Sequence, residues 1–504
     1  MSSPDTTLPA AAQAALDEGR RHHEARDLAA ALQAYQRANA LAPDSEPVLA
    51  ALGALAMDAR DWPAAERIHR LLETRFPGRH LARLALAVFN QQRHADALPL
   101  FERMAGAGNI DANCALAYAM CLERCGHPER AIGVMISIYR ATGGEQMAVL
   151  LISAFLRLGR RAELDEWLPR VLAAHPDNGQ LLAARSEHGF LSGDYGTGFD
   201  YVRHRWAVAM EKPKAAEMAC PYWDGQPFDG TLLVTAEQGL GDEILSSSMF
   251  EELVARGQHA IIDCEPRLLP VFRRSFPALA FADRSNRELV QSGLDPRNRK
   301  IEALELGRFF RRDMADMPRR TSWLSADPQR VAHWRRWLAE QFPGRRTVGL
   351  SWRSNRHLLG DSKTIPLGAL GGLLENPGLA CINLQYGDIA PDLATLPSPT
   401  ASRLHLAPGL DATRNIDDLF ALIAALDAVV TCSNTTAHIA GAQGMPTFVM
   451  LPGSRYVLWY WGHDGARTPW YPSLQLFRGP PRKDWQALAG DVLATLAAMP
   501  GAGS

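Results

Sequence analysis

The chain has 504 residues, a net charge of −2, 47% hydrophobic residues and 21% charged residues. This length exceeds that of a single domain, and the composition is that of a globular protein rather than a disordered one. The near-neutral charge gives no sign of binding to nucleic acid or to a membrane surface, and no apolar run is long enough to span a membrane.

The cysteines and the N-terminal residues bear on the compartment. The seven cysteines are scattered and lie mostly in apolar segments, which predicts buried thiols in a reduced cytoplasm. The first twenty residues contain no basic stretch followed by an apolar core, so we expect no signal peptide and a cytoplasmic location. Cys121 and Cys125 are one helical turn apart but have no second ligand pair nearby, so we expect no zinc site.

An internal repeat occupies residues 10–210. In its clearest copies, Gly19, Ala31, Tyr35 and Pro43 are followed by Gly53, Ala65, His69 and Pro77, so that glycine, alanine and proline recur 34 residues apart. This is the period of a tetratricopeptide helix–turn–helix, in which small residues let two helices cross closely and proline ends the second helix. Weaker copies follow, so we predict five to six units with a concave groove, usually for a peptide or protein. An irregular helical bundle is the alternative.

The pattern changes near Glu211, where prolines and glycines mark a linker. Strands are then predicted at 232–234, 259–264 and 278–282, and later at 347–352, 380–385, 428–432 and 447–451. Helices are predicted at 242–256, 266–276, 327–342, 367–374, 416–426, 435–443 and 483–498, whereas residues 283–325 are ambiguous. Two consecutive series of strands and helices predict two Rossmann-like domains facing one another across a cleft. The predicted domains are therefore 1–210, 211–342 and 343–504.

The first loop with candidate chemistry follows the strand at 232–234. Gly239 and Gly241 permit a tight turn and a close approach of backbone to a ligand. Asp242 is expected at the start of the next helix, where the dipole favours a carboxylate. This places Asp242 at the carboxyl edge of a parallel sheet, where open α/β sheets bind ligands.

A second loop follows the strand at 428–432. Ser433, Asn434 or Thr435 can cap the next helix, whose exposed N–H groups suit a phosphate. The hydroxyl of Thr436 adds a donor, and His438 lies about one turn into the helix. The alternative is an ordinary capped helix.

A third loop lies at 351–366. Arg353, Arg356 and Lys363, together with Ser354 and Asn355, are suited to hold a diphosphate through charge-assisted hydrogen bonds. A solvated loop is the alternative. The aromatic residues 459–461 line the cleft or form a buried cluster, and the sequence leaves both interpretations open.

Five motifs carry a family resemblance, together with the segments 469–472 and 476–478. They are Glu237-Gln-Gly-Leu-Gly-Asp242, Trp352-Arg-Ser-Asn355, Lys363-Thr-Ile-Pro-Leu367, Asn383-Leu-Gln385 and Asn434-Thr-Thr-Ala-His-Ile-Ala-Gly441. Their order resembles that of bacterial tetratricopeptide glycosyltransferases, whose catalytic half is similar to ADP-heptose–lipopolysaccharide heptosyltransferases. The resemblance covers about residues 10–480. It implies an N-terminal tetratricopeptide α-solenoid followed by a GT-B pair of Rossmann-like domains.

The resemblance also implies roles for single residues. Asp242 is the expected general base, Lys363 is expected at the donor phosphates, and Asn434–His438 are expected to bind the diphosphate. Gln385 ends the strand that usually faces the nucleotide. The family commonly has aspartate at the position of Asn434. The implied donor is a nucleotide-sugar, with no metal and no other cofactor, and the chain contains no Asp-x-Asp motif to hold an ion.

The expected function is inverting sugar transfer to a protein acceptor, such as flagellin or another surface protein, recruited by the repeats. A lipopolysaccharide or glycan acceptor is one alternative. Another is a scaffold whose α/β half is inactive. A dehydrogenase is disfavoured, because Gly239-Leu-Gly-Asp242 lacks the third glycine of the dinucleotide-binding fingerprint.

Overall fold

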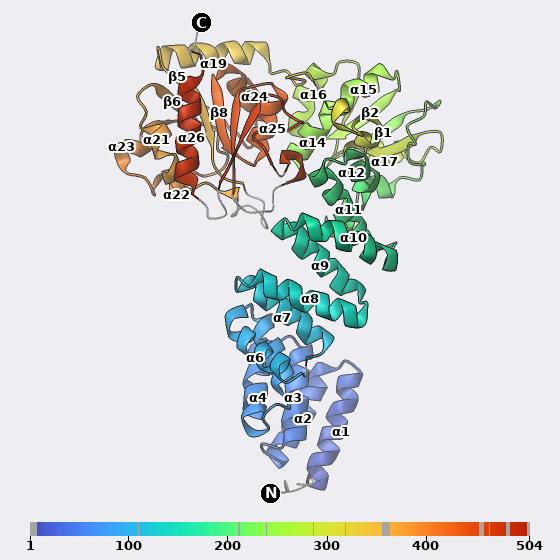
Figure 1. Ribbon diagram of the computed structural model, residues 1–504. Helices are drawn as coiled ribbons and strands as arrows, with labels where there is room; N and C mark the ends of the chain where they lie inside the picture. Colours follow the sequence, from blue (N-terminus) through green and yellow to red (C-terminus); the bar gives the residue numbers. More distant parts are fainter. Residues whose placement is uncertain are drawn as a thin grey trace. The chain divides into compact units, whose positions relative to one another are not determined.

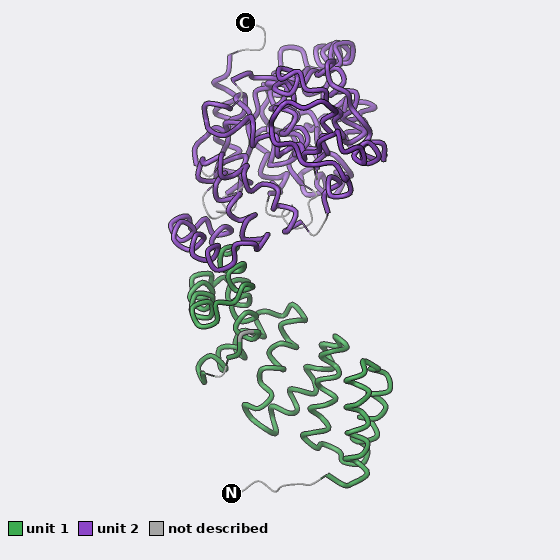
Figure 2. Tube along the Cα trace, turned by 90° about the vertical axis from the view of Figure 1, so that its right-hand side faces the viewer, with its two compact units in different colours: residues 1–154 green, residues 155–504 purple. Residues whose placement is uncertain are grey.

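The computed structural model describes residues 8–500 except 109, 210, 211, 238, 286, 318, 355–362, 453–457, 463 and 480–483. The chain divides into two compact units, residues 1–154 and residues 155–504 (Figure 2). The finer division at residues 210 and 342 that the sequence predicts stays a prediction.

The N-terminal part of the chain is a run of helix pairs (Figure 1). The helices are α1 (Ala10–Glu24), α2 (Leu28–Leu41), α3 (Glu46–Asp58), α4 (Trp62–Arg75), α5 (Leu81–Asn90), α6 (His94–Gly106), α7 (Ala112–Arg124), α8 (Pro128–Thr142), α9 (Glu145–Leu158), α10 (Arg161–Ala174), α11 (Gly179–Ser192) and α12 (Tyr195–Tyr201). The second helices of successive pairs begin 32 to 34 residues apart, at 28, 62, 94, 128, 161 and 195. The predicted helical repeat is therefore confirmed, with six pairs.

Glycines sit where the paired helices cross most closely. A methyl group at Gly19 would lie 2.4 Å from the ring of Tyr35, and one at Gly53 would lie 2.6 Å from the ring of His69. The 34-residue period therefore places a glycine of one helix against a ring of the next in both pairs. This contact confirms the interpretation of the repeated small residues.

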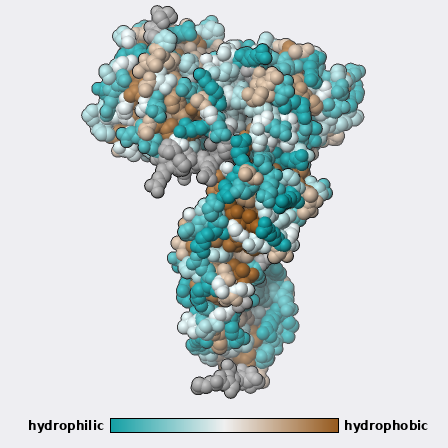
Figure 3. Space-filling view, viewed as in Figure 1, coloured by the Kyte–Doolittle hydropathy of each residue, from teal (hydrophilic) through white to brown (hydrophobic). Residues whose placement is uncertain are grey.

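The surface of the helical repeat is mixed in polarity. Figure 3 shows hydrophobic residues among hydrophilic ones on the face turned to the viewer. In residues 1–154 the exposed large apolar side chains include Leu32, Leu41 and Leu71. Single apolar residues of this kind are normal on protein surfaces, so they do not by themselves define a docking site.

Two parallel sheets form the rest of the chain. The first contains β1 (Leu232–Thr235), β2 (Ala260–Cys264), β3 (Ala280–Asp283) and β4 (Arg299–Glu302) in the order β3-β2-β1-β4. The second contains β5 (Arg346–Ser351), β6 (Leu379–Asn383), β7 (Leu404–His405), β8 (Ala428–Cys432), β9 (Thr447–Leu451) and β10 (Leu474–Arg478) in the order β10-β9-β8-β5-β6-β7. The predicted α/β region is confirmed, and β4, β7 and β10 are strands that the sequence analysis did not predict.

Helices connect these strands. They are α13 (Trp206–Ala209), α14 (Leu240–Ser246), α15 (Phe250–Ala255), α16 (Leu269–Ser275), α17 (Glu288–Ser292), α18 (Gly307–Phe310), α19 (Pro328–Gln341), α21 (Gly371–Leu374), α22 (Ala390–Leu393), α23 (Ser398–Ala401), α24 (Ile416–Ala425), α25 (Thr435–Ala442) and α26 (Trp485–Ala498). Among the residues that the structure describes, no helix has the length and apolar character that a membrane crossing requires.

The helix predicted at 242–256 differs in detail. It begins two residues earlier, at Leu240, because Gly239 is the N-cap. A 3₁₀ turn at Ser247–Met249 separates α14 from α15. Asp242 therefore lies within the first turn of α14 rather than at its cap.

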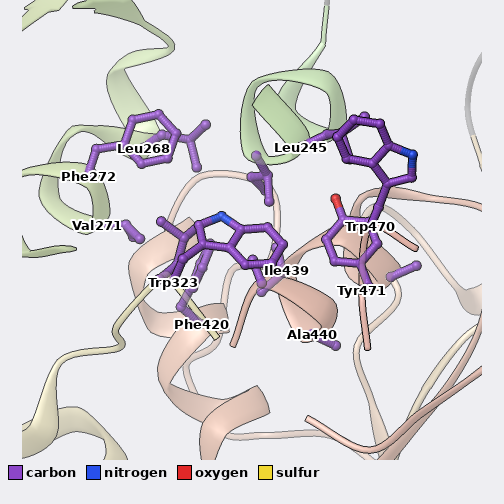
Figure 4. Close-up of a cluster of buried hydrophobic side chains, with 14 of the residues drawn as sticks. Leu245, Leu268, Val271, Phe272, Trp323, Phe420, Ile439, Ala440, Trp470 and Tyr471 are labelled. Atoms are coloured by element: carbon purple, nitrogen blue, oxygen red, sulfur yellow. The ribbon is translucent and has the colours of Figure 1, made fainter. Parts of the chain in front are cut away.

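The sheets are covered on both faces, as parallel sheets require. In β8, Val430 packs with α21 and α26, whereas its neighbour Val429 belongs to the core that contains α24 and α25. The core that contains α24 and α25 also includes side chains from α14, α15 and α16, which cover the first sheet. One continuous apolar cluster therefore joins the two sheets (Figure 4). Trp334 of α19 is buried and donates a hydrogen bond from Nε1 to Asp418 of α24 at 3.0 Å.

The last helix pair, α11 and α12, packs into this same core. Phe190 of α11 stacks on Trp459 with 4.2 Å between ring centroids, and Phe199 of α12 packs edge-on against Trp470. Just after α12, Arg205 forms ion pairs with Glu237 at 2.9 Å and with Glu302 at 2.8 Å. These contacts make α11 and α12 part of the α/β unit.

We expect residues 155–504 to fold as a soluble truncated chain and residues 206–504 not to. The shorter chain loses the buried rings of Phe190 and Phe199, each worth about 3–5 kcal/mol, against a typical domain stability of about 5–15 kcal/mol. It also leaves Glu237 and Glu302 buried without Arg205. Thermal unfolding of both chains followed by circular dichroism tests this. Equal cooperative unfolding of the two would contradict it.

Candidate functional site

The predicted loops lie at comparable points of the two sheets. In the first sheet β1 lies between β2 and β4, and in the second β5 lies between β6 and β8. The strand order reverses at both places, and open parallel sheets bind ligands at the carboxyl ends of such strands. The loops after β1, β5 and β8 carry the residues singled out from the sequence.

The helix after β1, α14, meets the helix after β8, α25, directly. A methyl group at Gly241 would lie 2.8 Å from Cδ2 and 3.1 Å from Nε2 of His438. The carboxylate of Asp242 lies beside Gly239, since a methyl group there would be 3.4 Å from its Oδ2. Packing of α14 on α25 therefore brings Asp242 and His438, 196 positions apart in the chain, into one site.

Asn434 is the N-cap of α25 and is fully engaged. Its Oδ1 accepts hydrogen bonds from the backbone N–H groups of Thr436 at 3.0 Å and Ala437 at 3.4 Å. Its Nδ2 donates to Ser351 Oγ at 2.8 Å and to the carbonyl oxygen of Arg353 at 3.2 Å. A carboxylate would face that carbonyl without a proton to donate, so the amide suits this position better than an aspartate.

Gln385 braces the end of β5. Its Oε1 accepts hydrogen bonds from Ser351 Oγ at 3.2 Å and from the backbone N–H groups of Trp352 and Arg353, each at 2.9 Å. The guanidinium of Arg353 forms an ion pair with Asp392 at 2.9 Å. Gln385 therefore holds the backbone at the start of the loop that follows β5. The ion pair with Asp392 directs the Arg353 side chain towards α22.

The remaining donor-site candidates differ in their surroundings. Ser433 is buried, and its Oγ accepts a hydrogen bond from Trp461 Nε1 at 2.8 Å. Thr436 is buried, whereas Thr435 and Ser354 are partly exposed. Asn355 and Arg356 lie outside the described residues.

Lys363, His438 and Tyr471 form the charged and polar centre of the site. Lys363 is buried, and its positive charge acts on both His438 and Cys432. Burial, followed by this charge, lowers the pKa of His438 to about 3, so its imidazole is neutral at physiological pH. Burial raises the pKa of Tyr471 well above its usual range, with smaller contributions from Tyr460 and Asp242.

Glu243 follows Asp242 but lies in different surroundings. Its carboxylate accepts hydrogen bonds from the backbone N–H of Glu265 at 2.9 Å and from Arg284 at 2.8 Å. Burial raises its pKa to about 8. Glu243 therefore ties α14 to the end of β2 and is engaged away from α25.

Sequence reasoning missed Tyr471 and Ser351. Tyr471 is fully buried and lies against His438, and Ser351 joins Gln385 to Asn434. A signal for Tyr471 was present, because it belongs to the segment 469–472 that resembles the family. The aromatic residues Tyr460 and Trp461 are buried beside His438, so they form a buried cluster at the site itself.

Comparison with known proteins gives a relative for most of the chain. No protein-family model matches it. The chain is 29% identical over 495 residues to Protein FlbA from Caulobacter vibrioides, and the match covers 93% of this chain and 81% of FlbA. The match therefore includes parts of both compact units. The name of FlbA states no reaction.

Solved structures similar to part of the chain include TPR proteins. YrrB, described as a TPR protein with an unusual peptide-binding site, has 16% identity and a TM-score of 0.31, over 35% of this chain and 98% of YrrB. PilW, a type IV pilus biogenesis factor, has 11% identity and a TM-score of 0.35, over 40% of this chain and 96% of PilW. MamA from Desulfovibrio magneticus has 14% identity and a TM-score of 0.32, over 34% and 98%.

We expect Gly241→Ala to destabilise residues 155–504 by about 1–3 kcal/mol, because its methyl group overlaps the ring of His438 inside a packed interface. Gly239→Ala is the matched control, since its methyl group meets only Asp242 Oδ2 at an ordinary contact distance. Urea unfolding of both variants measures the difference. Equal stability of the two would show that α14 and α25 are not in contact at Gly241.

Proposed function

We propose that this chain is an inverting glycosyltransferase of the GT-B type that uses a nucleotide-sugar donor. The observation that carries the proposal is the packing of α14 on α25, which brings Asp242 close to His438 at the carboxyl edges of two parallel sheets. The positive charge of the buried Lys363 acts on the same His438. Two-sheet α/β enzymes bind substrates at such edges. The resemblance of the five motifs to heptosyltransferase-like enzymes supports the same assignment.

Asp242 is the proposed general base. It takes the proton from an acceptor hydroxyl while the oxygen attacks the anomeric carbon of the sugar, and the bond from that carbon to the nucleotide diphosphate breaks. Positioned bases of this kind contribute about 100- to 10,000-fold in rate. The neighbouring Glu243 is tied to Arg284 and Glu265 and is not available for this role.

The leaving diphosphate is the proposed ligand of the helix α25. Its first turn presents backbone N–H groups and a partial positive charge, which favour phosphate. Lys363 is buried, and its positive charge acts on His438 of this helix and on Cys432, which ends the preceding strand. We expect no metal, because the sequence has no Asp-x-Asp motif and these groups can neutralise the diphosphate.

The helical repeat is the proposed receptor for the acceptor. Stacked helix pairs commonly bind peptides and proteins, and YrrB, one of the similar repeat proteins, is described as having a peptide-binding site. We therefore infer a protein acceptor, with transfer in the cytoplasm. An acceptor glycan or lipopolysaccharide is the alternative.

A scaffold without catalytic activity is the second candidate. It is favoured by the engagement of Arg353 with Asp392 and by the amide at position 434, where the resembling enzymes commonly have aspartate. In this case the repeats bind a partner and the α/β unit binds no donor. Donor binding separates the two candidates.

We expect one member of a panel of ADP-, GDP-, UDP-, dTDP- and CMP-linked sugars to raise the melting temperature of the full chain. A ligand at 100 times its dissociation constant adds about 2.7 kcal/mol to the free energy of unfolding. Differential scanning fluorimetry measures the shift, with the corresponding free sugars as controls. No shift with any member, while an active relative responds, supports the scaffold.

We expect Asp242→Asn to reduce sugar transfer about 100-fold or more while donor binding stays within about twofold, because only the base is lost. Asp283→Asn is the matched control, since Asp283 ends β3 at the same sheet edge, away from β1. Transfer by each variant is measured with the donor identified by the panel. Full activity of Asp242→Asn would remove Asp242 from the mechanism.

We expect residues 155–504 to keep donor binding and slow donor hydrolysis but to lose transfer to a protein acceptor, because the repeats of residues 1–154 are absent. Mass spectrometry of the acceptor, incubated with the full chain or with residues 155–504, gives the transfer yield. Equal transfer by both would show that these repeats are not the acceptor's receptor.

A further inference from the structure

The ring of Tyr471 is packed between Trp323 and helix α25. It is fully buried, and its ring stacks on Trp323 with 5.4 Å between centroids and 19° between planes. On another side its ring lies against Gly441 of α25, where a methyl group would be 2.5 Å away. Figure 4 shows Tyr471 beside Trp323 and Ile439. Its hydroxyl therefore has one fixed position.

That position is next to His438. The phenol oxygen of Tyr471 lies 2.6 Å from Nδ1 of His438, which is a short hydrogen bond. The imidazole is neutral, so one of its ring nitrogens carries a hydrogen and the other accepts. The phenol keeps its proton, because burial, with a smaller effect of the nearby Asp242 carboxylate, raises the pKa of Tyr471 well above its usual range.

The other ring nitrogen faces Gly241 in the first turn of α14. A methyl group at Gly241 would be 3.1 Å from Nε2 of His438, which places this nitrogen beside the residues that lead into Asp242. A buried phenol needs an acceptor, and Nδ1 lies at the right distance to be one. If the phenol donates to Nδ1, the imidazole hydrogen is on Nε2 and points away from Tyr471.

We propose that Tyr471 is a positioning residue that donates its hydroxyl hydrogen to Nδ1 of His438 and thereby keeps an N–H donor on Nε2, directed at the anionic oxygens of a nucleoside diphosphate. The identity of that ligand rests on the proposed function, whereas the hydrogen bond does not. A neutral ring with a hydrogen on Nε2 donates there and takes up no proton, so the role of base stays with Asp242.

The tautomer of His438 is measured by two-bond ¹H–¹⁵N correlation NMR on the full chain labelled in histidine, with the signal assigned by its loss in His438→Gln. We expect hydrogen on Nε2 in the wild type and a mixture of tautomers in Tyr471→Phe, which removes only the hydroxyl. Tyr195→Phe is the matched control, since that ring packs on Trp470 in the same cluster. Hydrogen on Nδ1 in the wild type overturns the proposal.

Binding of ADP, GDP, UDP and dTDP, followed by calorimetry, gives the second measurement. We expect Tyr471→Phe to weaken the binding of the preferred diphosphate about tenfold, which is the scale of one hydrogen bond. His438→Gln, whose amide nitrogen replaces Nε2, is expected to bind more tightly than His438→Asn, whose amide replaces Nδ1. The reverse order overturns the proposal. Absence of binding to the wild type instead counts against the proposed function, and the tautomer still decides the role of Tyr471.

Discussion

The site depends on one packing contact, that of the Gly241 backbone against the ring of His438. This contact joins the first turn of α14, which follows β1 of the first sheet, to α25 of the second sheet, inside an apolar cluster that both sheets share. Because the cluster is closely packed, the distance between α14 and α25 is fixed by the absence of a side chain at Gly241. Asp242 owes its position beside α25 to this contact.

Polar groups around α25 are arranged as a closed network. Asn434 joins the helix N-terminus to Ser351 at the end of β5, and Gln385 joins Ser351 to the next loop. Each of these side chains uses both its donor and its acceptor atoms, which is the condition for polar groups to be stable when buried. The network therefore specifies an amide at position 434, and replacing it by a carboxylate would leave the carbonyl of Arg353 unpaired.

The helical repeat and the α/β unit are not simply joined end to end. The pair α11 and α12 belongs to the core of the second unit through Phe190 and Phe199, and Arg205 neutralises two buried carboxylates of the first sheet. These buried carboxylates require Arg205, since a buried charge without a partner is costly. Phe190 contacts Trp459 and Phe199 contacts Trp470. Trp459 also packs against Tyr460, and both Tyr460 and Trp461 pack against His438, so aromatic contacts connect α11 and α12 with the site.

The sequence by itself determined the element types. The 34-residue period predicted the helix pairs, and the buried apolar runs at 428–432 and 447–451 matched β8 and β9 residue for residue, because local periodicity reflects the burial of a single element. The charged strand β4 and the two-residue β7 have no such pattern and were missed. The glycines at 239 and 241 were also apparent, as was a helix cap among Ser433, Asn434 and Thr435, because these are local backbone requirements.

Only the tertiary structure decided which of these residues meet. No local pattern relates Gly241 to His438 or Tyr471 to His438, since these contacts arise from the packing of elements far apart in the chain. The same holds for Arg353, which the sequence predicts as a phosphate ligand and which the fold places in an ion pair with Asp392. A side chain's partner is set by the global packing, whereas its chemical type and its local backbone are set by the sequence around it.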